Sequence, residues 1–144
     1  MVRSFFLMII LIFFSGCGNQ KIEENYFIGK WKSNDGASFI LKQDGTCILK
    51  SLNYYVISSF PRNENQKLNC EGIWKMVTDA ESGLIDGIDK GIKITYHAPG
   101  NQRDGSITFY ISGEGALGSK KPLSLFIWDG DPDEMKRYTF IKEQ

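Results

Sequence analysis

Residues 92–96 read Ile-Lys-Ile-Thr-Tyr, so large apolar and polar side chains alternate strictly along this segment. Because successive side chains of a β-strand point to opposite faces, the alternation predicts a strand with one buried and one exposed face. The segments 107–111 (Ile-Thr-Phe-Tyr-Ile) and 138–141 (Tyr-Thr-Phe-Ile) are rich in β-branched and aromatic residues, which also favour strands. These three segments indicate an all-β protein.

Asp-Gly pairs interrupt the strand-like segments at 35–36, 44–45, 86–87, 104–105 and 129–130. Between apolar runs this dipeptide favours a hairpin, because both central residues of the tight turn need a positive φ. Working outward from these turns, we expect strands at 28–33, 37–42, 45–51, 53–59, 69–77, 91–97, 106–112, 122–128 and 137–142.

Two segments depart from simple alternation. The stretch 52–60 carries large apolar residues that would lie on both faces of a strand. Burial on both faces would explain it, as would an exposed aromatic edge that docks a partner. The best helical candidate is 79–89, although Gly83 and Gly87 weaken a helix there.

The strand pattern predicts an antiparallel meander of eight or nine short strands closed into a small barrel, with a β-sandwich as the alternative. A chain of 144 residues fits a single domain. Lys and Arg number 17, as do Asp and Glu, so the formal net charge is zero. This balance argues against nucleic-acid binding, which needs a basic excess to neutralise phosphates.

The N-terminus has the pattern of a secretory signal: Arg3 precedes ten consecutive apolar residues, 5–14. A helix of that length spans about 15 Å, too short to cross a bilayer. The apolar run ends in Phe14-Ser15-Gly16-Cys17, which resembles the lipobox of bacterial lipoproteins, where Leu usually stands at the position of Phe14. The resemblance implies cleavage before Cys17 and lipidation of its thiol; an ordinary signal peptide is the alternative.

This interpretation divides the chain into a signal peptide (1–16), a lipidated tether (17–26) and a barrel domain (27–144). Removing the signal peptide would leave a net charge of −1, so lipid and not surface charge would hold the protein at a membrane. We expect the cell envelope as its location. In a Gram-negative organism, Gly18 after the cysteine resembles lipoproteins sorted to the outer membrane, facing the periplasm.

The tripeptide Gly29-Lys30-Trp31 on the first expected strand resembles the Gly-x-Trp signature of lipocalins and related calycin barrels. In that family the tryptophan closes one end of the barrel, and an arginine from the last strand packs over its ring. The resemblance therefore implies a small lipocalin-like barrel in which Arg137 lies over Trp31.

Two cysteines, Cys47 and Cys70, remain after Cys17. In an oxidising compartment an even pair favours a disulfide, which would stabilise the fold by about 3 kcal/mol in the chain-entropy estimate. We therefore expect a Cys47–Cys70 bridge.

The densest group of charges is the run Asp129-Gly130-Asp131-Pro132-Asp133-Glu134. Its alternating aspartates resemble the start of a calcium-binding EF-hand loop, but the sixth and twelfth positions hold Glu134 and Phe140 where glycine and glutamate are required. We interpret the run as a hairpin turn whose side chains Asp129, Asp131, Asp133 and Glu134 form a candidate surface for a protein partner.

Catalytic, metal and cofactor motifs do not emerge from the sequence. His97 is the single histidine, and no motif places a nucleophile near it. We predict no catalytic residues, no metal site and no cofactor, and treat a His97–carboxylate enzyme as the least supported hypothesis.

The sequence leads to two main functional hypotheses. The first is a membrane-anchored lipoprotein that acts as a non-catalytic binding module for a protein partner or a small apolar ligand. The second is an immunity or inhibitor protein that neutralises an envelope-acting toxin, lysozyme or secreted effector. Short strands favour a narrow interior that side chains alone could fill, and an acidic turn suits a basic active site.

Overall fold

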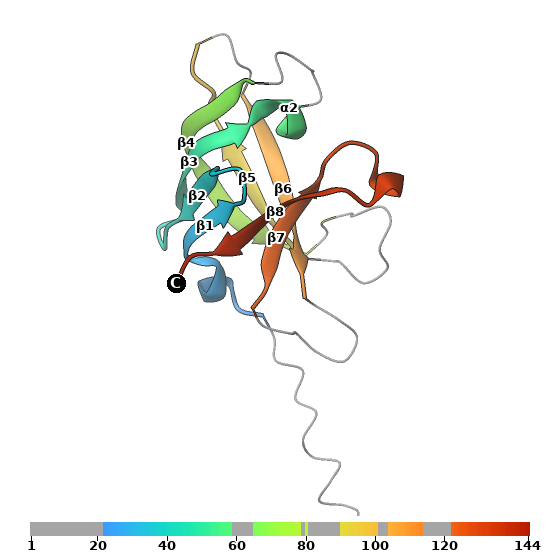
Figure 1. Ribbon diagram of the computed structural model, residues 1–144. Coiled ribbons are helices and arrows are strands. Elements are labelled where there is room, and N and C mark those ends of the chain that lie inside the picture. The colour runs from blue at the N-terminus through green and yellow to red at the C-terminus, as the bar shows by residue number, and fades with distance from the viewer. Residues whose placement is uncertain (1–21, 59–64, 79, 81–89, 101–103, 114–121) are drawn as a thin grey trace, which may run out of the picture.

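The computed structural model describes residues 22–58, 65–78, 80, 90–100, 104–113 and 122–144. Within these ranges eight strands run antiparallel to their neighbours in sequence order, and the last pairs with the first to close a barrel (Figure 1). The predicted closed meander is therefore confirmed, and the sandwich alternative is wrong. The strands are β1 (Gly29–Ser33), β2 (Ser38–Leu41), β3 (Thr46–Asn53), β4 (Lys67–Val77), β5 (Gly91–Tyr96), β6 (Gly105–Ser112), β7 (Ser124–Trp128) and β8 (Arg137–Lys142).

Eight of the nine expected strands are present, but the strand predicted at 53–59 is wrong. A single helical turn, α2 (Tyr54–Ile57), follows β3 instead. The Asn53 side chain accepts a hydrogen bond from the Tyr55 amide at 3.1 Å and so caps the turn. Tyr54 is buried while Tyr55 is 43% exposed, so the apolar run is split between core and surface. The helical candidate at 79–89 lies outside the described residues except for Ala80.

The barrel closes through the register of β1 with β8, in which Trp31 lies opposite Lys142 and Ser33 lies opposite Phe140. Closure pairs the backbone groups of both outer strands, so the sheet has no open edge at this seam. Tight turns join β1 to β2 and β2 to β3. At Gly36 and Gly45 the φ angles are 86° and 81°, values that glycine adopts without strain.

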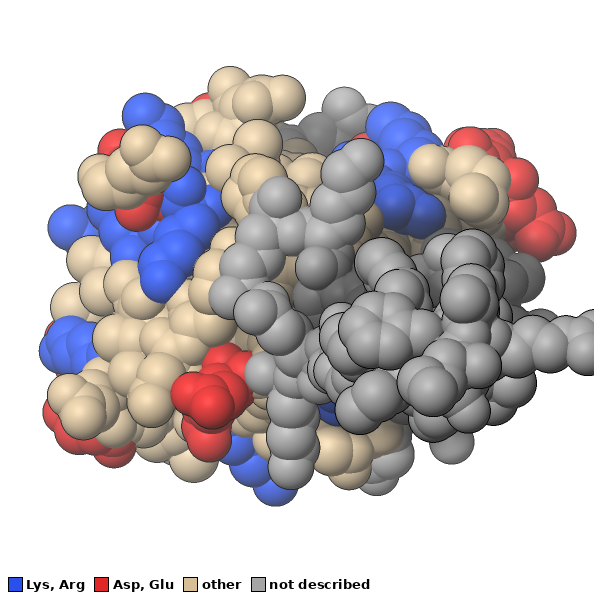
Figure 2. All heavy atoms as spheres, turned by 90° about the horizontal axis from the view of Figure 1, so that it is seen from below, with Lys and Arg blue, Asp and Glu red and all other residues tan. Residues whose placement is uncertain are grey.

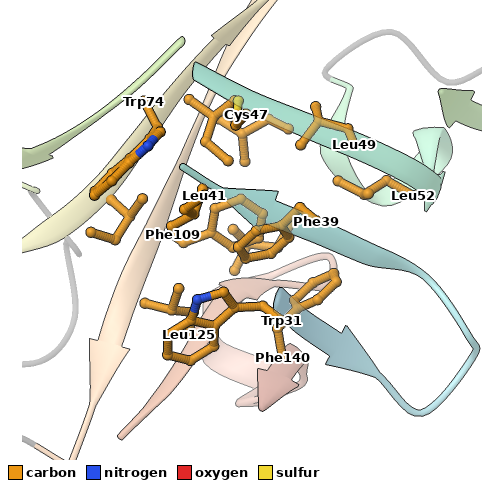
Figure 3. Packing of buried hydrophobic residues seen from close by; sticks show 14 of the residues in the cluster. Trp31, Phe39, Leu41, Cys47, Leu49, Leu52, Trp74, Phe109, Leu125 and Phe140 are labelled. Atoms are coloured by element: carbon orange, nitrogen blue, oxygen red, sulfur yellow. The ribbon is translucent and has the colours of Figure 1, made fainter. Parts of the chain in front are cut away.

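The barrel interior is filled by the protein's own side chains (Figure 3). Phe39, Phe109 and Phe140, from β2, β6 and β8, are fully buried and meet with ring centroids 4.8–5.4 Å apart. Aliphatic residues from neighbouring strands surround them, including Leu41, Leu49 and Leu125. The centre of the barrel is therefore a packed aromatic core, as expected for an eight-stranded barrel of short strands.

A short helix, η1 (Glu24–Phe27), closes one end of the barrel. Phe27 is fully buried and stacks on Trp31 with ring centroids 6.0 Å apart, and the Trp31 indole Nε1 donates to the Phe27 carbonyl oxygen at 2.9 Å. Ile22 is only 5% exposed. Ile22 and Tyr26, which belong to the predicted tether of residues 17–26, therefore pack against the barrel.

Antiparallel order places successive connections at alternate ends of the barrel. We call these the η1 end and the α2 end; Figure 1 shows η1 below the barrel and α2 above it. The η1 end holds the β2–β3 turn (42–45) and the end of β8. The α2 end receives the connections that follow β1, β3, β5 and β7.

Candidate protein-binding surface

The predicted acidic surface lies in the β7–β8 connection at the α2 end, where two carboxylates stabilise the turn itself. The Asp131 side chain accepts a hydrogen bond from the Asp133 amide at 3.0 Å and caps the short helix η2 (Pro132–Glu134). Asp129 pairs with the Lys136 Nζ at 2.7 Å, and this contact raises the pKa of Lys136. The Asp129 amide also donates to the Lys136 carbonyl at 3.0 Å, so the turn is closed at its base.

The tip of the same connection is exposed. Asp133 and Glu134 are both exposed, and the Glu134 carboxylate is close enough to Lys136 to contribute to the raised pKa of that ammonium group. Next to them, Met135 is 58% exposed and has a positive φ of 55°. The connection that carries η2 projects from the barrel beside β7 and β8 (Figure 1), and it presents an exposed apolar residue next to two exposed acidic residues. Such a tip suits a concave, basic surface on another protein.

Arg137 packs on the outer face of the barrel behind this turn. Its guanidinium carbon lies 4.2 Å from the ring centroid of Phe126 and 5.0 Å from that of Trp128. Those two rings are themselves 5.2 Å apart, edge to face. The Trp128 indole Nε1 is buried and has no hydrogen-bond partner among the described residues. This stacked group supports the base of the acidic turn.

The predicted contact of Arg137 with Trp31 is therefore wrong. In the register, Trp31 lies opposite Lys142, whereas Arg137 lies opposite Trp128. Arg137 and Lys142 are five residues apart on one strand, which is about 17 Å, and an odd spacing puts their side chains on opposite faces. The basic side chain of β8 that lies near the buried tryptophan is Lys142, whose Nζ is 4.9 Å from the ring centroid of Tyr26.

Cys47 and Cys70 are both free thiols, so the predicted disulfide is not formed. They lie on adjacent strands in diagonal positions, because Cys47 faces Gly72 and Cys70 faces Leu49. Diagonal residues have Cα atoms about 7–8 Å apart, beyond the usual range for a disulfide. Burial raises the pKa of each thiol to about 11, with the neighbouring Cys70 contributing at Cys47.

His97 pairs with a carboxylate, as the enzyme hypothesis requires, but at an exposed position. Its Nδ1 lies 2.7 Å from Asp104 Oδ2, and Asp104 Oδ1 accepts from the Ala98 amide at 2.9 Å. These hydrogen bonds, that of His97 first, lower the pKa of Asp104. The side chains of His97 and Asp104 are 87% and 61% exposed. The pair fastens the base of the β5–β6 connection.

A side-chain network at the α2 end was not foreseen from the sequence. The Tyr138 hydroxyl donates to Asp35, with oxygen distances of 3.0 and 3.2 Å, and so joins β8 to the β1–β2 turn. Asp35 also accepts from the Ser33 hydroxyl and the Ala37 amide, and Lys67 Nζ lies 3.6 Å away. The Asp35-Gly36 pair signalled the turn, but no local signal links it to a residue 103 positions later.

The network perturbs both titrating groups. Burial raises the pKa of Asp35, but the hydrogen bonds from Ser33, Ala37 and Tyr138 and the charge of Lys67 outweigh it, so the pKa lies below its ordinary value of 3.8. Burial and the nearby carboxylate raise the pKa of Tyr138 to about 12. A phenol this weakly acidic serves as a structural donor at neutral pH.

Cys17, the predicted lipidation site, lies outside the described residues. In the ranges that the structure covers, no three His, Cys, Asp or Glu side chains are grouped so that they could hold a metal ion. The same part of the chain contains no helix long and apolar enough to cross a membrane.

Comparison with known proteins returns no relative: no protein-family model matches the chain, and neither a curated protein nor a solved structure does. The class of the protein is therefore defined by its fold alone, an eight-stranded antiparallel β-barrel consistent with a lipocalin-like barrel.

Proposed function

We propose that this chain is a lipid-anchored lipoprotein of the cell envelope whose barrel acts as a non-catalytic binding module for a protein partner. The observation that carries the choice of partner is the packed interior. Where a lipocalin-like barrel would hold an apolar ligand, Phe39, Phe109 and Phe140 are in mutual contact. A ligand could enter only by displacing fully buried rings, at a cost comparable to unpacking the core. Binding is therefore assigned to the outside of the barrel.

The lipocalin-like character of the barrel is part of this proposal. It is supported by Trp31, which is fully buried beneath η1, and by a basic residue of the last strand, Lys142, that contacts the same end. The lipid anchor is supported by the Phe14-Ser15-Gly16-Cys17 sequence. Together they describe a rigid barrel held at a membrane, which suits presentation of a surface.

A second candidate function, inhibition of a cationic toxin, lysozyme or secreted effector, is favoured by the acidic tip of the β7–β8 connection. Asp133, Glu134 and Met135 are exposed, while hydrogen bonds at Asp131 and an ion pair at Asp129 hold the turn in place. A turn that is ordered before binding loses less conformational entropy on docking. This combination of rigidity and negative charge is complementary to a basic active-site cleft.

Site-specific photo-crosslinking in intact cells tests the binding-module proposal. A photoreactive phenylalanine analogue would replace Met135 at the turn and, as the matched control, Glu71 on the exposed barrel wall. We expect one protein adduct at Met135 that is absent at Glu71, and saturable binding of that purified protein to the barrel. The proposal would be contradicted if the same proteins were cross-linked at both positions, or if lipid were the only molecule cross-linked.

Charge substitution separates the inhibitor hypothesis from other partner modes. Asp133→Lys with Glu134→Lys reverses the tip while leaving the cap at Asp131 intact; Glu71→Lys is the control. If the partner is a basic catalytic cleft, the double variant should lose binding and inhibition more than tenfold, with a smaller loss at high salt. Unchanged affinity would exclude the acidic tip.

A further inference from the structure

The chain enters the barrel at a firmly held point. Beyond the Phe27–Trp31 contact, the Lys142 ammonium donates to the Tyr26 carbonyl oxygen, and the Tyr26 hydroxyl accepts from the Leu123 amide at 3.1 Å. Ile22, just before η1, is buried. Residues from β1, β8 and the segment before β7 thus fix η1, and the part of the chain free to act as a tether ends before Ile22.

The proposed anchor, Cys17, is close to this point along the chain. Five peptide units separate the Cα atoms of Cys17 and Ile22, so they are at most about 17 Å apart even if the segment is fully extended. The tether expected from the sequence, residues 17–26, spans nine peptide units and would have reached about 30 Å. The buried position of Ile22 therefore halves the distance at which a lipid anchor could hold the barrel.

The length of the barrel exceeds this reach. The longest strand, β4, has 11 residues; at about 3.3 Å per residue and a tilt of about 40°, it extends roughly 25 Å along the barrel axis. With the α2 end turned toward the bilayer, Ile22 would stand farther from the membrane surface than the tether allows. The inverted orientation is therefore excluded for a chain anchored at Cys17.

The described residues at the η1 end carry charges of both signs. Figure 2 shows the barrel from below, and basic and acidic side chains are interspersed over the described part of that face. Lys30 and Glu143, on this side, neutralise each other in an ion pair of 2.6 Å. The short tether, and not an electrostatic patch, would set the orientation.

We infer that the η1 end of the barrel is a membrane-facing surface whose occupant is the phospholipid bilayer, and that the α2 end is the surface presented to a protein partner. The inference rests on the proposed lipidation of Cys17. Four large apolar side chains of the described residues are exposed: Tyr55 and Met135, 43% and 58% exposed, lie in connections at the α2 end, and Ile73 and Ile141, 63% and 55% exposed, lie on the wall of β4 and β8. Bound end-on, the barrel holds the acidic β7–β8 turn away from the lipid head groups.

Quenching by lipid-bound nitroxide tests this orientation. The full-length lipoprotein would be purified, reconstituted in phosphatidylethanolamine–phosphatidylglycerol vesicles with a nitroxide on the head group, and labelled with a thiol-reactive fluorophore. Three variants carry the label: Gln43→Cys at the η1 end, and Asn34→Cys and Asp133→Cys at the α2 end, all at exposed positions. Unsubstituted protein measures background labelling of Cys47 and Cys70, which are buried and half-buried.

Flotation with the vesicles is measured first, because it tests the anchor alone. Protein that does not float overturns the proposed lipidation, and the orientation with it. For protein that floats, we expect quenching at Gln43 to exceed quenching at Asn34 and Asp133 several-fold. Equal quenching at the two ends, stronger quenching at the α2 end, or no quenching anywhere would overturn the orientation while leaving the anchor intact.

A longer tether tests the cause of the orientation. Inserting about twenty Gly and Ser residues after Asn19 adds a flexible coil with a mean span of roughly 25 Å. The difference in quenching between Gln43 and Asp133 should then largely disappear. A difference that persists with the long tether would contradict the argument from tether length.

Discussion

Lys142, near the end of the last strand, lies over the ring of Tyr26, 116 residues earlier, and donates a hydrogen bond to its carbonyl oxygen. The Nζ atom is 4.9 Å from the ring centroid, and burial lowers the pKa of the ammonium group. A half-buried cation is retained here because the ring face and the carbonyl replace part of its water. The contact joins the C-terminal strand to the helix that closes the barrel.

Replacing Lys142 with Met should detach η1 partially from β8. The loss of a cation–π contact and a charged hydrogen bond predicts a decrease of about 1–2 kcal/mol in the free energy of unfolding, measured with urea on the domain lacking residues 1–16. Lys30→Met is the matched control. It removes an exposed ion pair with Glu143 and should change stability by less than about 1 kcal/mol. Equal effects of the two substitutions would contradict a specific role for Lys142.

Phe109→Ala should test whether the interior is packed. Removing a fully buried ring that contacts Phe39 and Phe140 predicts a loss of about 3–5 kcal/mol. The cavity would be dry and apolar, so the variant should bind a benzene-sized ligand that the unsubstituted barrel does not bind, as measured by ligand-dependent thermal stabilisation. Ile73→Ala, at a 63% exposed position, is the control for the loss of apolar atoms. Binding of such ligands by the unsubstituted protein would argue for an existing internal cavity.

The strands could be predicted because their signal is local. In β5 the alternation of Ile92, Ile94 and Tyr96 with polar residues matches a burial pattern in which all three are buried. Turn chemistry likewise predicted the hairpins at Asp35-Gly36 and Asp44-Gly45, although only the glycine of each pair has a positive φ, so the expected turn type with two positive φ values is not formed. Alternation failed at 54–57, because four consecutive apolar or aromatic residues carry no period and a local cap at Asn53 decided in favour of a helical turn.

The long-range contacts could not be predicted in the same way. Which side chain packs near Trp31 depends on the register of β8 against β1. Lys142 lies opposite Trp31, and a register shifted by five residues would be needed to place Arg137 there. The cysteine prediction failed for the same reason, since neighbouring strands place Cys47 and Cys70 diagonally and not opposite each other. For the candidate surface, the sequence predicted the charged turn but not the different roles of its carboxylates. Asp129 and Asp131 stabilise the turn through an ion pair and a helix cap. Asp133 and Glu134 are exposed.

Gly72→Ala should separate β4 from β5. A Cβ atom at this position would lie 2.3 Å from the backbone oxygen of Thr95, and the backbone cannot move without breaking the ladder. We expect a loss of about 3 kcal/mol in unfolding free energy and faster hydrogen exchange of the β5 amides. In Gly36→Ala the new methyl group meets open space and only the positive φ opposes it, so the loss should be nearer 1 kcal/mol. Similar losses for both variants would contradict the close approach at Gly72.

The two thiols should react slowly in the folded barrel. With pKa values of about 11, Cys47 and Cys70 carry little thiolate at pH 7, and the strands shield them from reagents. The test uses the domain truncated to begin after Cys17 and exposed to air. A chromogenic disulfide reagent should react with it slowly in buffer and quickly in urea, and the reaction in urea should report two thiols per molecule. An intact mass lower by two hydrogen atoms, with no thiol released in urea, would show that the bridge forms after all.

The Asp35 network predicts a specific loss of stability in acid. Because the folded-state pKa of Asp35 lies below 3.8, its carboxylate stabilises the folded barrel at higher pH, and this stabilisation is lost as the pH falls from about 4 through the folded-state value. Asp35→Asn should lower stability at pH 7, where the bonds from Tyr138 and Ser33 to a charged acceptor are weakened, yet lose less on acidification than the unsubstituted protein. Urea midpoints between pH 7 and pH 2 measure the difference. Asp133→Asn, at an exposed position of the β7–β8 turn, is the matched control for removal of a carboxylate. If the curve of Asp35→Asn ran parallel to that of the unsubstituted barrel, the network would be excluded as the source of acid sensitivity.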